Sequence, residues 1–259
     1  MDIQQILGSG PGTYRIGVIA LANDQVIERD LSRLLPEEVL TYTTRIAFGG
    51  RCTLADLAQM APIVSDAARL LNPEVELDAV VFGCTSGTLA IGPGKIKASV
   101  QGICPTAQVI NPVDAACSAF ERLGVKRLNL VTPYEPELAG HVAEAFALRG
   151  FEILHRFDFG LEDSSDISRV KPEAILAAAT SLPDSDAEAT FISCTDFQSL
   201  TVLQEIEEIT GHPAISSNQA VVWSVLDMLG LDGNLTGFGR LLGPAIQQET
   251  DKQQHGAFQ

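Results

Sequence analysis

The sequence has little positive charge: 17 Lys and Arg stand against 33 Asp and Glu, a formal net charge of −16 over 259 residues. This balance argues against nucleic acid and against an anionic membrane surface as partners, because both carry negative charge themselves. It leaves an anionic small molecule open as a ligand, since a binding site is local and net charge is not. Long apolar runs are missing as well, so no segment is expected to cross a bilayer.

The N-terminus and the cysteines favour a reduced, cytoplasmic protein. The first residues, MDIQQILGSGPGTYR, lack the basic start and the apolar run that are typical of a signal peptide. The five cysteines are odd in number and form no close pairs, which indicates free thiols rather than a disulfide framework.

Signals for a metal or a cofactor are also missing. The four histidines show no metal-ligand spacing. The glycine-rich stretches at 8–12 and 92–95 lack the context of a nucleotide site, because the first precedes its strand and the second follows a cysteine loop. We therefore expect loops at both stretches, and neither a metal nor a cofactor.

Short apolar runs alternate with helical patterns along the chain. Continuous apolar strands separated by amphipathic helices are typical of a parallel sheet covered on both faces, so the sequence predicts an α/β fold. The expected strands are 14–21, 77–83, 127–132 and 189–194, and the expected helices are 53–71, 133–150, 171–182 and 197–211.

The chain also resembles itself at a spacing of about 110 residues. RIGVIAL at Arg15 matches RLNLVTP at Arg127, the Cys-Thr pair at Cys84 matches that at Cys194, and similar short matches follow each pair in order. This repeat predicts two similar lobes that face each other across one cleft. We assign residues 1–118 with 217–259 to the first lobe and residues 119–216 to the second.

Each lobe then carries one cysteine at the carboxyl end of a buried strand, where open parallel sheets bind their ligands. At such a strand-to-helix turn the helix N-terminus is expected to stabilise a thiolate and lower its pKa. One thiolate can remove a carbon-bound proton or add to an activated double bond, and the opposite thiol can donate a proton. A buried cysteine that only packs is the alternative, but two cysteines at matched strand ends, Cys84 and Cys194, favour catalysis.

The residues after these cysteines are candidates for binding a substrate carboxylate. Thr85, Ser86 and Thr195 lie in the two turns and could donate hydrogen bonds to a carboxylate or a developing enolate. The other three cysteines lack such a setting and are predicted to be structural: Cys52, Cys104 and Cys117.

With these motifs in place, the sequence resembles the Asp/Glu racemase superfamily, which includes maleate isomerases and arylmalonate decarboxylases. The resemblance is strongest to the ectoine-utilisation branch and runs from about Arg15 to about Leu242. It is carried by the stretches GVIALANDQVIERD, LDAVVFGCTSGTLAIGPGKI, LVTPYEPEL, FISCTDF and ISSNQAVVW.

The resemblance implies two Rossmann-like lobes related by a pseudo-twofold axis, with cofactor-independent chemistry between them. It also implies that Tyr134 contacts the substrate carboxylate, although a tyrosine that anchors a helix start is equally expected. Asn218, near the start of the last large helix, is interpreted as that helix's N-cap.

Asp24 departs from the family pattern, since maleate isomerases carry a substrate-binding asparagine there. An ionised aspartate can only accept hydrogen bonds, so it would repel a dicarboxylate and attract a positively charged group. A helix-capping or turn aspartate is the alternative reading.

The sequence therefore predicts a cofactor-independent isomerase or racemase for a small carboxylate, with an ectoine-derived or amino-acid-like compound as the leading candidate. A maleate-type cis–trans isomerase and an arylmalonate-type decarboxylase remain enzymatic alternatives. Outside enzymology, the chain could be a catalytically silent binding protein. Formation of a homo-oligomer is possible as well, and the sequence leaves the oligomeric state open.

Overall fold

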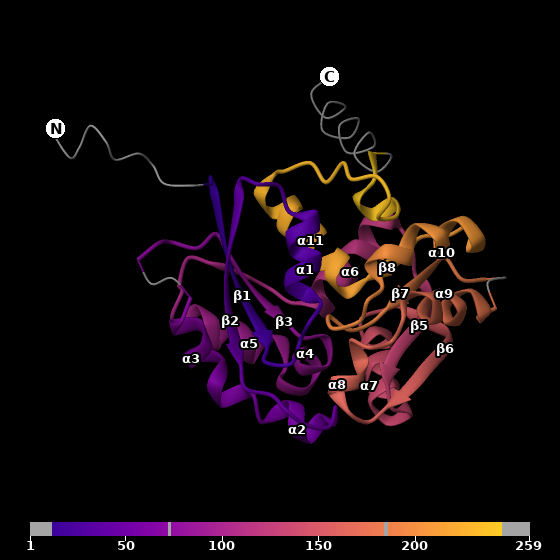
Figure 1. Ribbon diagram of the computed structural model, residues 1–259, viewed down its shortest axis with the longest axis horizontal. Helices are drawn as coiled ribbons and strands as arrows, with labels where there is room; N and C mark the ends of the chain where they lie inside the picture. Colours follow the sequence, from indigo (N-terminus) through magenta and orange to yellow (C-terminus); the bar gives the residue numbers. More distant parts are fainter. Residues whose placement is uncertain (1–11, 72–73, 184–185, 245–259) are drawn as a thin grey trace.

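The computed structural model describes residues 12–71, 74–183 and 186–244, and places their strands in two sheets (Figure 1). All pairings within both sheets are parallel. The first sheet has the order β2-β1-β3-β4 and the second has the order β6-β5-β7-β8. The strands are β1 (Tyr14–Leu21), β2 (Val39–Ile46), β3 (Ala79–Gly83), β4 (Gln108–Ile110), β5 (Arg127–Tyr134), β6 (Glu152–Leu161), β7 (Ala189–Ile192) and β8 (Ala214–Ser216).

The helices connect these strands and cover the sheets. They are α1 (Ile27–Leu34), α2 (Leu54–Ala58), α3 (Val64–Arg69), α4 (Thr85–Ile91), α5 (Pro93–Gln101), α6 (Pro112–Leu123), α7 (Pro136–Ala147), α8 (Ser164–Ile167), α9 (Pro172–Ser181), α10 (Leu203–Thr210) and α11 (Ser217–Leu229), with short 3₁₀ turns at Ala61–Ile63, Leu200–Val202 and Arg240–Leu242. The predicted α/β fold with two similar lobes is confirmed: the four strands of each sheet follow the same order, and the central strands β3 and β7 are buried at every residue.

Three expected elements differ from the observed ones. The helix expected over 53–71 is broken into α2, a 3₁₀ turn and α3, because Pro62 lacks the N–H that a continuous helix needs. The helix expected over 197–211 begins as a 3₁₀ turn at Leu200 and is α-helical only from Leu203. The glycine-rich stretch at 92–95 is no loop: Gly92, at φ 94°, ends α4, and Pro93 opens α5.

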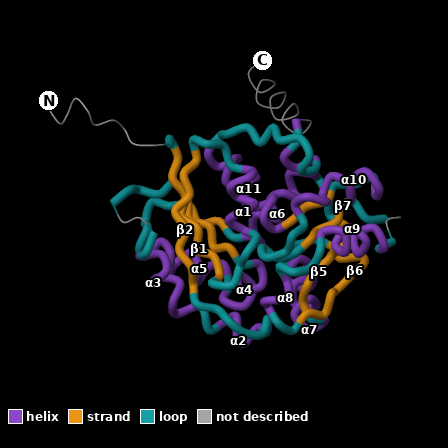
Figure 2. Tube along the Cα trace, viewed as in Figure 1, coloured by secondary structure: helices purple, strands orange, loops and turns teal. Residues whose placement is uncertain are grey.

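Two long helices link the lobes. Phe120 of α6 packs edge-on against Phe146, Phe151 and Phe191, which belong to the layer around the second sheet. Helix α11 follows the last strand of the second sheet and packs against α1 and α6. Figure 2 shows these three helices between the two groups of strands. The predicted lobe boundary between 118 and 119 falls inside α6, and the assignment of residues to lobes remains a prediction.

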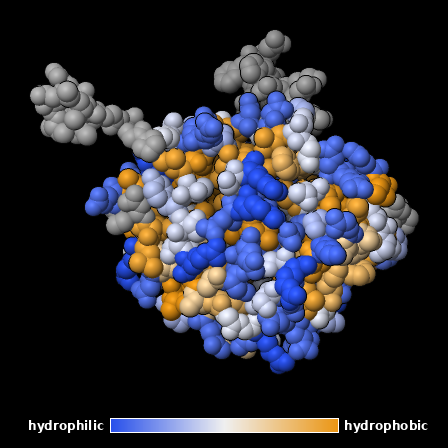
Figure 3. Space-filling view, viewed as in Figure 1, coloured by the Kyte–Doolittle hydropathy of each residue, from blue (hydrophilic) through white to orange (hydrophobic). Residues whose placement is uncertain are grey.

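The surface carries no extended apolar face on the side shown in Figure 3, where hydrophilic and hydrophobic residues are interspersed. Among the described residues no helix is both long enough and apolar enough to cross a membrane.

Candidate active site

One cavity receives a cysteine from each lobe. Cys84 directly follows β3 and Cys194 lies two residues beyond the end of β7, the equivalent strand of the second sheet. Both side chains line the same small cavity of about 20 Å³, which has room for about one water molecule. The expected meeting of the two cysteines is therefore observed. A substrate of several carbons requires the lobes or their connecting segments to move apart.

Cys84 is the N-cap of α4. Its sulfur accepts a hydrogen bond from the Gly87 N–H at 3.2 Å and lies 3.7 Å from the Ser86 hydroxyl. A side chain at Gly87 would place its first carbon 2.9 Å from the same sulfur, so only glycine permits this approach. Burial raises the pKa of Cys84 to about 11, although Gly87 and Ser86 both lower it. The expectation of a lowered pKa was wrong for the closed cavity, because desolvation outweighs the helix N-terminus.

Cys194 has an unusual backbone. Its φ of 116° is the only positive φ among the described residues other than glycine, a strained conformation that is common at functional sites. Its backbone N–H donates to the Ser217 hydroxyl at 3.0 Å, and the Thr85 hydroxyl donates to the same oxygen at 2.9 Å. Thr85 does not line the cavity, which argues against its predicted contact with substrate. Instead it links the start of α4 to the start of α11 and supports Cys194.

Thr195 lines the cavity and joins the lobes. Its hydroxyl donates to the carbonyl of Gly83 at 3.1 Å, and its own carbonyl accepts from the Asn218 amide at 2.8 Å. The interpretation of Asn218 as a helix N-cap was wrong, because Ser216 caps α11. The Asn218 amide also donates to Asp30, a fully buried carboxylate of α1, at 2.9 Å.

Tyr134, at the end of β5, also lines the cavity and is fully buried. Its hydroxyl has no hydrogen-bond partner of normal geometry among the described residues, and such a buried donor is poised for a ligand. Burial raises the pKa of Cys194 well above its usual value, the Asp196 carboxylate raises it further, and the Tyr134 hydroxyl lowers it. The contact of Tyr134 with a substrate carboxylate stays a prediction.

Asp24 both holds the turn before α1 and lines the cavity. One carboxylate oxygen, Oδ1, accepts from the backbone N–H groups of Val26 at 2.8 Å and Ile27 at 2.9 Å. The expected role as a turn aspartate is thus observed, while Val26 is the N-cap of α1 and the carboxylate still lines the cavity. Its contact with substrate remains a prediction.

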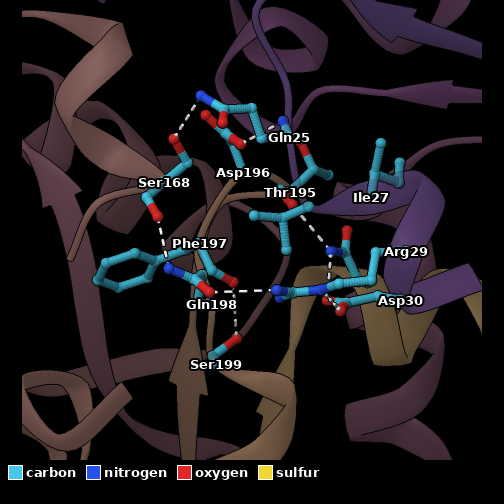
Figure 4. Close-up of polar contacts among 12 residues, drawn as sticks. Gln25, Ile27, Arg29, Asp30, Ser168, Thr195, Asp196, Phe197, Gln198 and Ser199 are labelled. Atoms are coloured by element: carbon cyan, nitrogen blue, oxygen red, sulfur yellow. Dashed lines mark hydrogen bonds and ion pairs between the residues drawn. The ribbon is translucent and has the colours of Figure 1, made fainter. Parts of the chain in front are cut away.

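Two ionisable residues of the cavity were missed as site residues. Asp196 follows the second Cys-Thr pair and lines the same cavity as Asp24. Figure 4 shows its contact with Gln25. Its position two residues after Cys194 was the available signal. Cys52 was predicted to be structural, yet it also lines the cavity. Burial raises the pKa of Cys52 to about 12.

Cys52 reaches the cavity because its segment bridges the lobes. Arg51 pairs with Asp163 in an isolated antiparallel bridge and forms an ion pair with Glu162 at 2.9 Å. The carbonyl of Gly50 accepts from the Ser164 hydroxyl at 2.9 Å. Such contacts between positions more than a hundred residues apart have no sequence signal.

Comparison with known proteins shows which proteins share this architecture. The maleate isomerase of Geobacillus stearothermophilus is 24% identical over 244 residues, 88% of this chain and 97% of that protein. The structure of a maleate isomerase from Pseudomonas putida S16 has a TM-score of 0.83 at 22% identity, and covers 90% of this chain and 98% of that one. A Nocardia farcinica maleate cis–trans isomerase, solved as a cysteine-to-serine mutant with a covalently bound succinylcysteine intermediate, has a TM-score of 0.82 at 25% identity over 89% of this chain and 98% of that one.

Two similar lobes that each contribute one cysteine to a shared cavity, together with these relatives, define an isomerase of the Asp/Glu racemase-like superfamily. Within that class, the chain belongs to the arylmalonate decarboxylase family, whose model matches residues 105–242.

The burial of the cavity predicts the order in which the cysteines react. Iodoacetamide should label Cys104, which lines a separate surface groove, before Cys84, because burial withholds both solvent access and the thiolate form from Cys84. Mass spectrometry of partially labelled protein at pH 8 measures this order. Faster labelling of Cys84 would show that the cavity is open in solution.

Proposed function

We propose that the protein is a racemase or isomerase that moves a proton at the carbon beside the carboxylate of a small acid, using Cys84 and Cys194. The acid also carries a positively charged nitrogen, as ectoine-derived and amino-acid-like compounds do. The observation that carries this proposal is that the two cysteines come from equivalent strand ends and line one cavity.

The chemistry requires one thiolate and one thiol at a time. The thiolate accepts the proton from carbon, and the electron pair of the broken C–H bond delocalises into the carboxylate as an enolate. The opposing thiol then donates its proton to the other face of the same carbon, so the two cysteines exchange protonation states in each turnover. The Tyr134 and Ser86 hydroxyls line the same cavity and supply donors for the negative oxygens.

A maleate-type reaction is the second candidate, since relatives named maleate isomerase match about nine-tenths of the chain. There a thiolate would add to the double bond, the central bond would rotate, and elimination of the thiolate would release the trans acid. The two carboxylates of Asp24 and Asp196 in the cavity oppose a dicarboxylate such as maleate. A decarboxylase needs only one proton-donating cysteine, so the second cysteine favours isomerisation.

Solvent deuterium exchange tests the proposal. The protein would be incubated in D₂O with amino acids, ectoine, N-acetyl-2,4-diaminobutyrate, maleate and phenylmalonate, and the products followed by NMR. Racemisation or isomerisation should place deuterium beside the carboxylate of an amino-acid-like or ectoine-derived compound without loss of CO₂. The Cys84→Ser variant should lose this turnover and exchange only the enantiomer whose proton faces Cys194. Deuterium that appears only after loss of CO₂ would indicate a decarboxylase. Formation of fumarate from maleate would indicate the maleate-type isomerase. The absence of any reaction would indicate a binding protein.

A further inference from the structure

Two carboxylates in the cavity accept hydrogen bonds from the same turn of the backbone. Asp24 Oδ1 accepts from the N–H groups of Val26 and Ile27, and Asp196 Oδ1 accepts from the N–H of Gln25 at 2.7 Å. The turn before α1 therefore holds both carboxylates, and Figure 4 shows the Asp196 contact with Gln25. Neither side chain can swing away without giving up a hydrogen bond to backbone.

The second oxygen of Asp196 accepts no hydrogen bond from the described residues, and the carboxyl group that interacts with Asp196 is that of Asp24. Asp196 is 7% exposed and lines the cavity, and its Oδ2 is buried with no hydrogen-bond donor in the described part of the chain. A buried carboxylate oxygen without a donor is rare in folded proteins, and it points to a group that arrives from outside. Both aspartates use Oδ1 to accept from backbone N–H groups, and of the two only Asp196 has a second oxygen that is buried without a donor among the described residues.

Within the described part of the chain, no cationic side chain lies against this oxygen in the cavity. No Lys, Arg or His is among the described residues that line the cavity. Arg45 of β2 is the nearby cation, but its guanidinium donates to the carbonyls of Leu21, Ala22 and Asp24 and pairs with Glu28.

We propose that Asp196 determines which substrates the enzyme accepts, by receiving a protonated nitrogen of the substrate on its free carboxylate oxygen beside Asp24. The inference rests on the proposed function in taking the cysteine cavity as the substrate site. It identifies the substrate class as small acids that carry an ammonium or amidinium group, and it excludes plain dicarboxylates.

Binding of such a nitrogen also changes the protonation of the site. The pKa of Asp196 is raised to about 7, by burial and by the adjacent Asp24 carboxylate, while Arg45 lowers it. Near neutral pH part of the free protein therefore carries a proton on Asp196, and a substrate cation displaces that proton.

The same cation also lowers the pKa of the cavity cysteines. The Asp196 carboxylate raises the pKa of Cys84, Cys194 and Cys52, the three thiols of the cavity. A positive charge placed on Asp196 offsets this repulsion and favours a thiolate at the moment when substrate is bound.

Calorimetric titration tests the assignment with 2,4-diaminobutyrate and 4-aminobutyrate as cationic probes and succinate as the dicarboxylate probe. The wild-type protein should bind a cationic probe more tightly than succinate. Titrations near pH 7 in two buffers of different ionisation enthalpy should show that binding of a cationic probe releases protons. Asp196→Asn should shift the affinity ratio at least tenfold towards succinate and abolish proton release.

The control is Asp227→Asn, which removes one charge from an exposed position on α11 and should change neither quantity. If Asp196→Asn fails to fold by circular dichroism, Asp24→Asn replaces it, since asparagine caps a helix about as well. That variant should move proton release to lower pH, because the neighbouring carboxylate that raises the pKa of Asp196 is gone.

The outcomes separate this inference from the proposed function. The role of Asp196 is overturned if the wild-type protein prefers neither cationic probe over succinate. It is also overturned if Asp196→Asn leaves the preference and the proton release unchanged. Both conclusions hold even if racemisation is observed. Cation preference with proton release but without deuterium exchange on any acid supports Asp196 and overturns the proposed reaction.

Discussion

Replacing Cys194 by serine should lower the rate of isomerisation about 1,000-fold, because a positioned acid or base contributes about 10²–10⁴-fold. A serine hydroxyl is a far weaker acid than a thiol, so it can neither hold the negative charge nor return the proton at a useful rate. Exchange of the substrate's α-proton with solvent should survive for one enantiomer only, since Cys84 still reaches one face of the carbon. NMR in D₂O with each enantiomer measures both quantities.

The matched control is Cys104→Ser, which makes the same chemical change at a surface groove outside the cavity and should leave the rate unchanged. Circular dichroism should show both variants folded, since serine is similar to cysteine in size. A rate for Cys194→Ser within tenfold of the wild type would exclude a two-cysteine mechanism.

Replacing Asp196 by asparagine should stabilise the free protein at pH 8. The pKa of Asp196 is raised from 3.8 to about 7 in the folded protein, chiefly by burial and then by Asp24. Between these two values the folded state binds more protons than the unfolded state, so the free energy of unfolding falls as pH rises. Above pH 7 the carboxylate costs on the order of 2–4 kcal/mol, which an uncharged amide avoids.

Urea unfolding at pH 4 and pH 8 measures this gain. The variant should exceed the wild type by a few kcal/mol at pH 8 and match it closely at pH 4, where Asp196 is protonated in the folded protein. Equal free energies of unfolding for the variant and the wild type at pH 8 would show that the folded structure does not destabilise the ionised Asp196 carboxylate. A gain there would indicate stability given up for function, as expected of a side chain held ready for a ligand.

Much of the fold could be predicted from local pattern. The strands at 14–21 and 189–194 are continuous apolar runs, and such runs are buried on both sides in a parallel sheet. The repeat then placed Cys84 and Cys194 at equivalent strand ends, which the structure brings to one cavity. Local pattern was insufficient at 53–71. The apolar periodicity of this segment predicted one continuous helix, but Pro62 interrupts it.

The sequence by itself determined the two-lobed α/β architecture and the pair of cysteines that meet in the cavity, because both depend on patterns that repeat along the chain. Only the tertiary structure decided what surrounds those cysteines. It brought Cys52 and Asp196 into the cavity, removed Thr85 from it, and reversed the expected pKa of Cys84. These properties depend on burial and on contacts between distant segments, since desolvation is a property of the closed cavity and not of the turn that carries the thiol.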